Sequence, residues 1–252
     1  MEVHHHTSSP RKKWSHYVWE FLMLFFAITL GFLTENLREE IKSKREIHSD
    51  MESIVADLNS DVNYFDSVIL RNEYACKMAD SMIRLLINEP SKTSDIYYMA
   101  RTVTANFGYF YLNAKTFEQM KASGALRLLK PRWLLDSIAD YYTSIQWLAN
   151  QTELMRMKVD AIHLGNSQLF NTGVFQDMMQ IDYGNFQHGV ISIKKPDGNP
   201  ALLSHDFQKI NDVALRYHYL FSTIKFYDKT AAQMCDQGRK LVGLIRKEYD
   251  LK

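Results

Sequence analysis

Residues 21–33 read FLMLFFAITLGFL, a run without a single charged side chain. No glycine or proline occurs from 32 to 89, so a helix that passes Gly31 in this run meets no further breaker before Pro90. Trp14, Tyr17 and Trp19 precede the run, where amphipathic aromatic side chains suit the interface of a bilayer. Residues 14–34 make 21 positions, close to the ~20 that cross the hydrocarbon layer. The sequence therefore predicts a transmembrane helix over 14–34.

Two other interpretations of this segment are weaker. A cleaved signal peptide would end in small residues in an A-x-A arrangement, whereas Phe-Leu-Thr-Glu-Asn follows here at 32–36. A buried helix of a soluble core would fit the short uncharged run, but the basic residues at 11–13 and the aromatic belt argue against it. Glu20 is the one acidic residue inside the predicted span. It is either an interfacial carboxylate among the Trp and Tyr rings or a buried acid that pairs with a partner helix.

Basic residues flank both ends of the predicted span. Arg-Lys-Lys at 11–13 adjoins the apolar run on a short tail, and four basic residues follow the span at Arg38, Lys42, Lys44 and Arg45. Acidic residues count for little in the positive-inside rule, so Glu35, Glu39, Glu40 and Glu46 do not decide the orientation. We expect the short tail in the cytoplasm and the large domain outside it, which is the periplasm at the inner membrane of a Gram-negative cell.

Residues 1–13 form a short polar tail that includes His4, His5 and His6. Three adjacent histidines on such a tail lack a scaffold that would fix metal-ligand geometry. We interpret them as a disordered tail or an expression remnant, and predict no metal site there.

Apolar residues recur at alternating steps of three and four along the long helix predicted over 35–89. We call this line of positions the seam. It comprises Leu37, Ile41, Met51, Val55, Leu58, Val62, Phe65, Ile69, Cys76, Ala79, Ile83 and Leu86, with Lys44, His48 and Asn72 at three of its steps. A heptad-like stripe predicts packing against the rest of the bundle or against another chain, so we expect a protein partner or self-association.

Further helices are predicted over 95–122, which is rich in aromatic residues and contains Gly108 as a break or close contact, and over 131–165, which Gly165 and Asn166 would close. An irregular connection, 166–204, contains four glycines and a run at 189–194 that reads as a short strand. A last helix begins near 204–206. These stripes can be buried only on one another, so residues 35–252 are predicted to form an elongated, all-α, water-soluble bundle.

Composition excludes several function classes. The 30 basic and 29 acidic residues give a net charge of +1, without the basic excess that holds a nucleic-acid backbone. The sequence contains no phosphate loop, dinucleotide fingerprint, nucleophile elbow or paired-histidine zinc motif. The remaining histidines have no metal-site spacing, and Glu118 reads as surface or as a structural pair. We therefore predict no catalytic residue, no metal ligand and no cofactor site.

The two cysteines, Cys76 and Cys235, occupy seam-like positions of the first and last long helices. If the last helix runs antiparallel to the first from the end near Glu89, the two sulfurs lie too far apart for a disulfide, which needs Cα atoms within about 7 Å. If the connection 166–204 crosses the length of the bundle, the levels match. We predict the antiparallel path and two buried free thiols.

Two stretches resemble a known family. WEFLMLFFAITLGFLTENLREE at 19–40 resembles the anchor of single-pass membrane proteins of unknown function from Bacteroidota-type bacteria, and TFEQMKASGALRLL at 116–129 resembles an internal element of the same proteins. Together they cover about 36 residues. The resemblance implies a bacterial membrane location and carries over no site residues.

Three classes of function are considered. The first is a membrane-anchored helical scaffold or interaction protein, with the lipid bilayer and a protein as partners. The alternative is an extracytoplasmic, sensor-like ligand-binding domain that relays through a partner, for which the aromatic residues at 97–117 are the best pocket lining, although such residues more often form core. The third class, an enzyme, lacks any acid/base or nucleophile constellation in the sequence.

Overall fold

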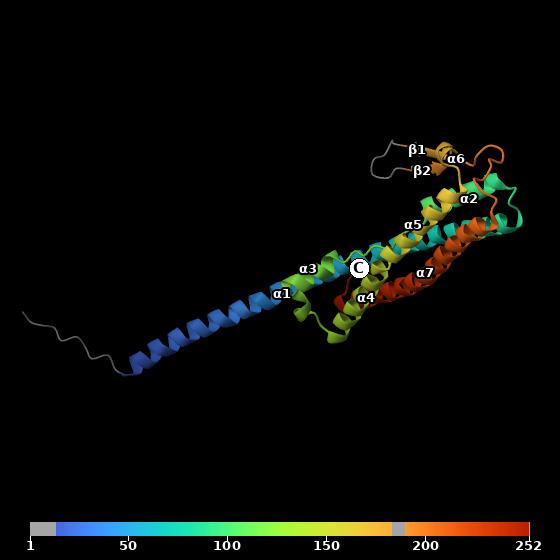
Figure 1. The fold of residues 1–252 in the computed structure, drawn as a ribbon. Coiled ribbons are helices and arrows are strands. Elements are labelled where there is room, and N and C mark those ends of the chain that lie inside the picture. The colour runs from blue at the N-terminus through green and yellow to red at the C-terminus, as the bar shows by residue number, and fades with distance from the viewer. Residues whose placement is uncertain (1–13, 183–189, 252) are drawn as a thin grey trace, which may run out of the picture. The chain divides into compact units, whose positions relative to one another are not determined.

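The computed structural model describes residues 14–182 and 190–251, and these are almost entirely helical (Figure 1). The elements in chain order are α1 (Trp14–Asn88), α2 (Thr93–Asn106), α3 (Lys115–Ser123), the 3₁₀ helix η1 (Ala125–Leu128), α4 (Arg132–Asn150), α5 (Thr152–Leu169), α6 (Thr172–Asp177), β1 (Met179–Asp182), β2 (Val190–Ile193) and α7 (Phe207–Tyr249). The all-α prediction is confirmed, and so is the prediction that one helix runs from the apolar segment to position 88. The chain divides into unit 1, residues 1–50, and unit 2, residues 51–252.

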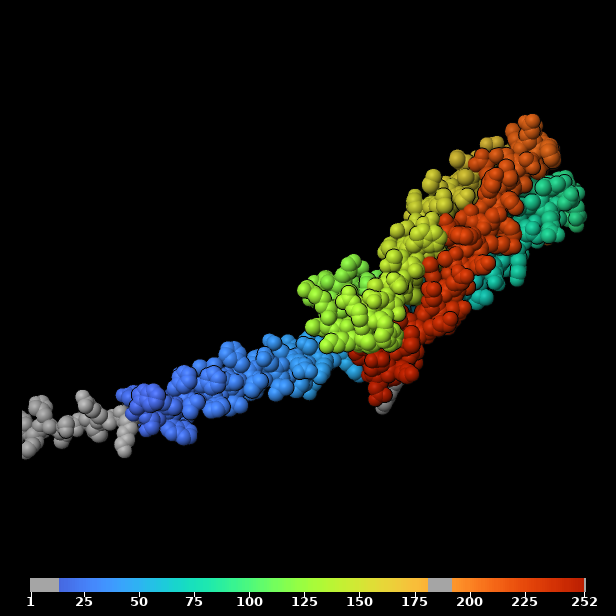
Figure 2. Space-filling view, turned by 90° about the horizontal axis from the view of Figure 1, so that it is seen from below, coloured from blue at the N-terminus to red at the C-terminus, as the bar shows by residue number. Residues whose placement is uncertain are grey.

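Unit 2 is a bundle with four sides. Three of them are the 51–88 part of α1, the nearly collinear pair α4 and α5, and α7, which packs along α4 and α5 (Figure 2). The fourth side is composite and consists of α2, the segment 107–114 and α3. Tyr64 of α1 donates a hydrogen bond to the carbonyl of Tyr109 in this segment over 2.8 Å, which fixes the segment against α1.

The seam is the core-facing line of α1 within unit 2. From Met51 to Leu86 every seam residue is buried except Ile69 and Ile83, which are partly buried. α7 runs antiparallel to α1, because Gly238 lies against Val62 while Asp228 bonds to Asn72, ten residues further along α1. The predicted antiparallel path is therefore confirmed, and both cysteines are free and buried as predicted.

The prediction of a helix over 95–122 is wrong in its middle. α2 ends at Asn106, where the chain turns to an extended conformation at Phe107, and residues 107–114 form neither helix nor strand before α3 begins. The predicted break at Gly108 is real: its N–H donates to the side-chain oxygen of Asn72 over 2.8 Å, and a Cβ there would meet Val68 Cγ1 at 3.0 Å. The helix stops because α1 offers these backbone atoms better partners than a further turn would.

The helix predicted over 131–165 consists of two helices. It is interrupted at Gln151 between α4 and α5, and α5 continues past Gly165 to Leu169, so the predicted end at Gly165 and Asn166 is wrong. Gly165 instead lets α7 approach closely, because a Cβ there would meet Cδ of Arg216 at 2.8 Å. The last helix begins as predicted, with the side chain of Asp206 accepting a hydrogen bond from the N–H of Lys209.

The connection 166–204 is more ordered than the sequence suggests. It contains the end of α5, the short α6 and an antiparallel hairpin in which Met179 pairs with Ile193 and Asp182 pairs with Val190. The predicted strand near 189–194 is confirmed for 190–193, while Gly189 lies outside the described residues. Tyr97 of α2 ties this region to the bundle: its hydroxyl accepts from the N–H of Asn171 at 2.8 Å and donates to the carbonyl of Ala201 at 3.1 Å.

The described part of unit 1, residues 14–50, is a single helical segment. Within the described residues, α1 is the one helix long and apolar enough to cross a membrane, and none of the side chains in its most apolar 18-residue window is buried. Large apolar side chains therefore face outward along 21–33, among them Phe21, Phe25, Phe26 and Leu30. The predicted tail 1–13 and its three histidines lie outside the described residues.

Candidate functional site: a charged cleft between α1 and α7

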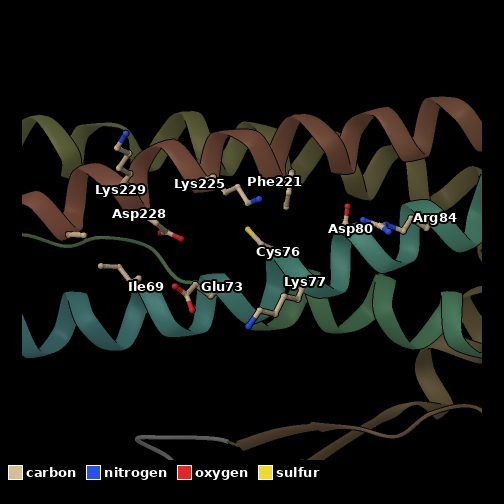
Figure 3. A pocket seen from close by; sticks show the side chains of 11 residues that line it. Ile69, Glu73, Cys76, Lys77, Asp80, Arg84, Phe221, Lys225, Asp228 and Lys229 are labelled. Atoms are coloured by element: carbon tan, nitrogen blue, oxygen red, sulfur yellow. Dashed lines mark ion pairs between the residues drawn. The ribbon is translucent and has the colours of Figure 1, made fainter.

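A cleft of unit 2 lies between α1 and α7 and has a volume of about 590 Å³ (Figure 3). Its volume falls in the range of small-molecule pockets, about 300–1,000 Å³. The α1 wall consists of Ile69, Glu73, Cys76, Lys77, Asp80 and Arg84, and the α7 wall of Phe221, Lys225, Asp228, Lys229 and Ala232. On α1 these positions follow one another at helical spacing, so a single face of that helix forms the whole wall.

Two positions of the lining carry short side chains, Cys76 on α1 and Ala232 on α7. Cys76 projects from α1 into the space between the helices, and Phe221 and Lys225 approach it from α7 (Figure 3). Elsewhere on the seam a large side chain, Phe65, packs against Phe110 of the 107–114 segment, with ring centroids 5.2 Å apart. The seam therefore contributes a small side chain, Cys76, to the cleft wall.

A buried hydrogen-bond relay includes Asp228, one of the residues that line the cleft. Nδ2 of Asn72 donates to Oδ1 of Asp228 over 2.7 Å, and Oδ1 of Asn72 accepts the N–H of Gly108 over 2.8 Å. Asn72 is fully buried and Asp228 is only 8% exposed. One amide thus links α1, α7 and the segment 107–114, and it satisfies three polar groups that would otherwise be costly to bury.

Burial determines the charge state of Asp228. Loss of solvation raises the pKa of this carboxyl from 3.8 to about 7, against the opposing effect of the Asn72 hydrogen bond, and the nearby carboxylate of Glu73 raises it further. The rim carries cations as well: Lys225 Nζ stands 4.2 Å from the ring centroid of Phe221, and Arg84 pairs with Asp80 at 2.9 Å. The cleft therefore presents both signs of charge around an apolar floor.

Cys76 is not an activated thiol. Burial is the largest influence and raises the pKa of this thiol to about 12, with Asp228 adding to the effect and Lys225 opposing it. A thiol needs a lowered pKa to act as a nucleophile near neutral pH. Its role in the cleft is that of a small apolar side chain.

A second polar cluster lies deeper in the bundle, between α1, α3 and α4. Asp57 accepts hydrogen bonds from the side chain of Asn113 and from the N–H of Thr116, both at 3.2 Å, and so caps the first turn of α3 from outside that helix. Asp61 is 2% exposed, and within the described residues neither its Oδ2 nor the hydroxyl of Tyr142 has a hydrogen-bond partner. Burial and the charge of Asp57 raise the pKa of Asp61 to about 7.

The aromatic residues at 97–117 do not line this cleft. Tyr97, Phe107, Phe110 and Phe117 are buried in the core, where Phe117 stacks on Tyr142 with centroids 4.5 Å apart. The interpretation as core is confirmed for these four residues, whereas Tyr111 of the same cluster is exposed. The histidines at 48, 163, 205 and 218 and Glu118 are exposed on the surface.

The sequence drew attention to Asn72 and Cys76 only as seam positions. Asp228 was missed because nothing local distinguishes it from a surface aspartate in a polar stretch of α7. The one feature of the sequence that points to a residue such as Asp228 is the polar Asn72 on the seam, because a buried amide requires a polar partner.

Within residues 14–182 and 190–251, no group of three or more His, Cys, Asp or Glu side chains is arranged to hold a metal ion. Comparison of the chain with protein-family models, with curated proteins and with solved structures found no match.

Proposed function

We propose that this chain is a single-pass, membrane-anchored helical interaction protein, which acts by binding another protein rather than by catalysis. One observation carries the proposal: an outward-facing apolar segment, 14–34, belongs to the same helix that supplies the core seam of unit 2. The segment that would enter the bilayer and the seam that supports the bundle are therefore consecutive parts of one helix, α1.

The proposed location is the inner membrane of a bacterium, with the bundle in the periplasm. The basic cluster at 11–13 supports a cytoplasmic N-terminus, and the aromatic belt at Trp14, Tyr17 and Trp19 supports an interfacial position for the start of the helix. The resemblance of 19–40 to the anchors of Bacteroidota-type membrane proteins supports the bacterial assignment.

The cleft favours a second candidate, a ligand-binding domain that signals through a partner. The cleft lies against the buried relay of Asn72 and Asp228, which joins three segments of the bundle. A small molecule that engages Asp228 there would alter a contact shared by α1 and α7. Isothermal titration of the full-length protein in nanodiscs with a panel of amino acids and small carboxylic acids tests this candidate, and Asp228→Asn is the matched variant.

Alkaline carbonate extraction tests the anchor. We expect the wild-type chain to stay in the membrane pellet and Leu24→Glu/Leu30→Glu to move to the supernatant, because carboxylates near the bilayer centre oppose insertion. The matched control Leu37→Glu lies beyond the span and should stay in the pellet. Release of the wild-type chain would contradict the proposal.

Orientation has its own test. Lys229→Cys places a thiol on the exposed surface of α7. A membrane-impermeant maleimide added to intact spheroplasts should label it if the bundle is periplasmic. Labelling that requires cell lysis would place the bundle in the cytoplasm instead.

A further inference from the structure

The outer surface of α5 and α7 carries an exposed apolar face. The two helices lie side by side on the surface of unit 2 (Figure 2), and both direct large apolar side chains to solvent there. We call six of these residues the outer face, and each exposes 42–66% of its surface: Leu154, Met157 and Leu164 on α5, and Leu215, Tyr219 and Phe226 on α7.

The outer face consists of one row on each helix. The α5 row starts at Leu154 and proceeds by steps of three, four and three, with the partly buried Ala161 between Met157 and Leu164. The α7 row proceeds from Leu215 by steps of four and seven. Steps of this size keep side chains on one side of a helix, and the buried core positions of both helices fall between them. Each of these helices is therefore apolar on its outer side as well as toward the core.

The two rows stand at matching heights of the bundle. The hydroxyl of Tyr227 donates a hydrogen bond to the side chain of Gln151 over 3.1 Å, and a Cβ at Gly165 would meet Cδ of Arg216 at 2.8 Å. The two contacts show that α5 and α7 run antiparallel and fix which positions are level. Apolar residues of the two rows share three levels: Leu164 with Leu215, Met157 with Tyr219, and Leu154 with Phe226.

We propose that the outer face binds a second copy of this chain, in a dimer whose two-fold axis runs parallel to α5 and α7. Such an axis leaves every residue at its own height and sets α5 of each copy against α7 of the other. This inference deepens the proposed interaction function. The parallel arrangement rests on the proposed anchor, because copies inserted in one membrane share one orientation.

The matching heights make the face complementary to itself. In the proposed dimer the rows of opposite copies meet level by level: Leu164 contacts the partner's Leu215, Met157 the partner's Tyr219, and Leu154 the partner's Phe226. Symmetry makes each contact twice. A different protein would need two apolar rows at the same three levels, whereas a second copy supplies them by symmetry.

The size of the face fits an interface between two such copies. A large apolar side chain with about half of its surface in water contributes on the order of 100 Å², so the outer face presents on the order of 500 Å². A stable interface covers about 800 Å² on each partner, and roughly 60% of that area is apolar. The outer face therefore supplies about the apolar area that a stable dimer needs.

The polar groups beside the two rows already have partners within the chain. Nε of Arg216 donates to the carboxylate of Asp212 over 2.7 Å, and its second nitrogen donates to the carbonyl of Ala161 over 2.9 Å. Nζ of Lys158 stands 5.7 Å from the ring centroid of Tyr219. A second copy can therefore cover this surface without leaving the guanidinium unpaired, which would oppose association.

Cysteine pairs in native membranes test the proposed arrangement. Two differently tagged chains are expressed together, one with Leu164→Cys and the other with Leu215→Cys, and the product that carries both tags is measured after mild oxidation. A disulfide needs Cα atoms within about 7 Å. Leu70→Cys replaces Leu215→Cys in the matched control, because Leu70 is 67% exposed but lies on α1. We expect about tenfold more product from 164 with 215 than from 164 with 70, and the buried wild-type thiols set the background.

A charge on the outer face tests its role in association. Leu164→Asp places a carboxylate in the proposed interface, and Leu70→Asp is the matched control with an equally exposed leucine. Photobleaching steps of single fluorescently tagged chains in nanodiscs from native membranes count the copies. We expect Leu164→Asp to reduce the ratio of dimer to monomer about tenfold and Leu70→Asp to leave it at the parental value. Circular dichroism should show the same helix content in both variants, since both positions are exposed.

The outcomes separate this inference from the anchor. A wild-type chain that stays in the carbonate pellet but bleaches in one step and gives no product from 164 with 215 overturns the dimer and leaves the anchor in place. A stronger disulfide between two Leu164→Cys chains than from 164 with 215 overturns the parallel axis, and a disulfide from Leu164→Cys to a different protein overturns the second copy as occupant. Release of the wild-type chain from the membrane contradicts the anchor and with it the parallel arrangement.

Discussion

Asn72 of α1 and Asp228 of α7 share a buried hydrogen bond of 2.7 Å, and the same asparagine holds the backbone of Gly108. This single amide joins three segments that are distant in the sequence. It also ties the chain just beyond the end of α2 at Asn106 to α1, through the N–H of Gly108. The relay therefore connects a core position of the seam with the composite fourth side of the bundle.

Truncation of the Asn72 side chain should lower the stability of the folded chain considerably. Asn72→Ala leaves the N–H of Gly108 and the carboxyl of Asp228 without their partner, and each unsatisfied buried group costs about 1–3 kcal/mol. Thermal unfolding of the full-length protein in detergent, followed by circular dichroism, should show a melting temperature several degrees lower. Asn63→Ala, on the exposed side of the same helix, is the matched control and should melt like the parent. Equal melting of both variants would contradict the relay.

The two buried carboxyls predict a pH dependence. The pKa values of Asp61 and Asp228 are raised to about 7 in the folded chain from 3.8, so the folded state holds protons that the unfolded state has released. Their contribution to stability is complete below pH 4 and is lost as pH rises through 7. Between pH 6 and pH 8 each group should lower the free energy of unfolding by about 1 kcal/mol.

Asparagine variants isolate these groups. Asp61→Asn and Asp228→Asn remove the ionisation, so denaturant unfolding at pH 6 and pH 8 should give a smaller difference than in the parent. Asp160→Asn, at an exposed position of α5, is the control and should keep the parental difference. An undiminished pH dependence in the double variant Asp61→Asn/Asp228→Asn would refute the assignment.

Helices could be predicted from the sequence wherever local pattern decides them. The spacing of the seam residues from Met51 to Leu86 identifies the core face of α1 even when the helices that pack on it are unknown. Asp206 is a favourable N-cap residue, and it indicates where α7 begins. Gly108 indicates a break or a close contact, but the non-helical segment 107–114 could not be predicted, because it depends on Asn72 and Val68 of another helix. Aromatic residues at helical spacing suggested continuation there, and tertiary contacts overrode the pattern.

The cleft could not be predicted from the sequence either, because it also depends on contacts between helices. It exists only where residues 69–84 of α1 face residues 221–232 of α7, and no local signal sets that pairing. The raised pKa of Asp228 follows from burial between helices, which the surrounding sequence of charged and small residues does not suggest. Sequence reasoning found one member of the relay, Asn72, and missed the carboxyl that it binds.

Helices pack closely at Gly238 but not at Gly243, so alanine should have opposite effects on stability at these two positions. A Cβ there would meet Val62 Cγ2 at 3.0 Å and the hydroxyl of Tyr141 at 3.1 Å, whereas nothing lies within 4 Å of the same atom at Gly243. Both alanines gain about 1 kcal/mol of helix propensity. Gly243→Ala should therefore raise the melting temperature, and Gly238→Ala should lower it, since overpacking costs about 1–3 kcal/mol. Stabilisation by both would show that α7 lies further from α1 and α4 than described.

The thiols of Cys76 and Cys235 should be unreactive in the folded chain. Burial raises the pKa of Cys76 to about 12 and that of Cys235 to about 11, so neither thiol ionises appreciably near neutral pH. Iodoacetamide at pH 7.5 should leave both unmodified in the folded chain and alkylate both in denaturant, as read by mass spectrometry. A disulfide between them under non-reducing conditions would contradict the antiparallel path of α7.

The central claim is that residues 14–34 cross a bilayer, and the most direct measurement is the accessibility of a cysteine placed there. Ala27→Cys should resist a water-soluble maleimide in intact membranes and react after denaturation in detergent, because the middle of a spanning helix is surrounded by lipid. Glu39→Cys, beyond the predicted span, should react once the membrane side that holds the bundle is exposed. Labelling of Ala27→Cys in intact membranes at the rate of Glu39→Cys would contradict the account.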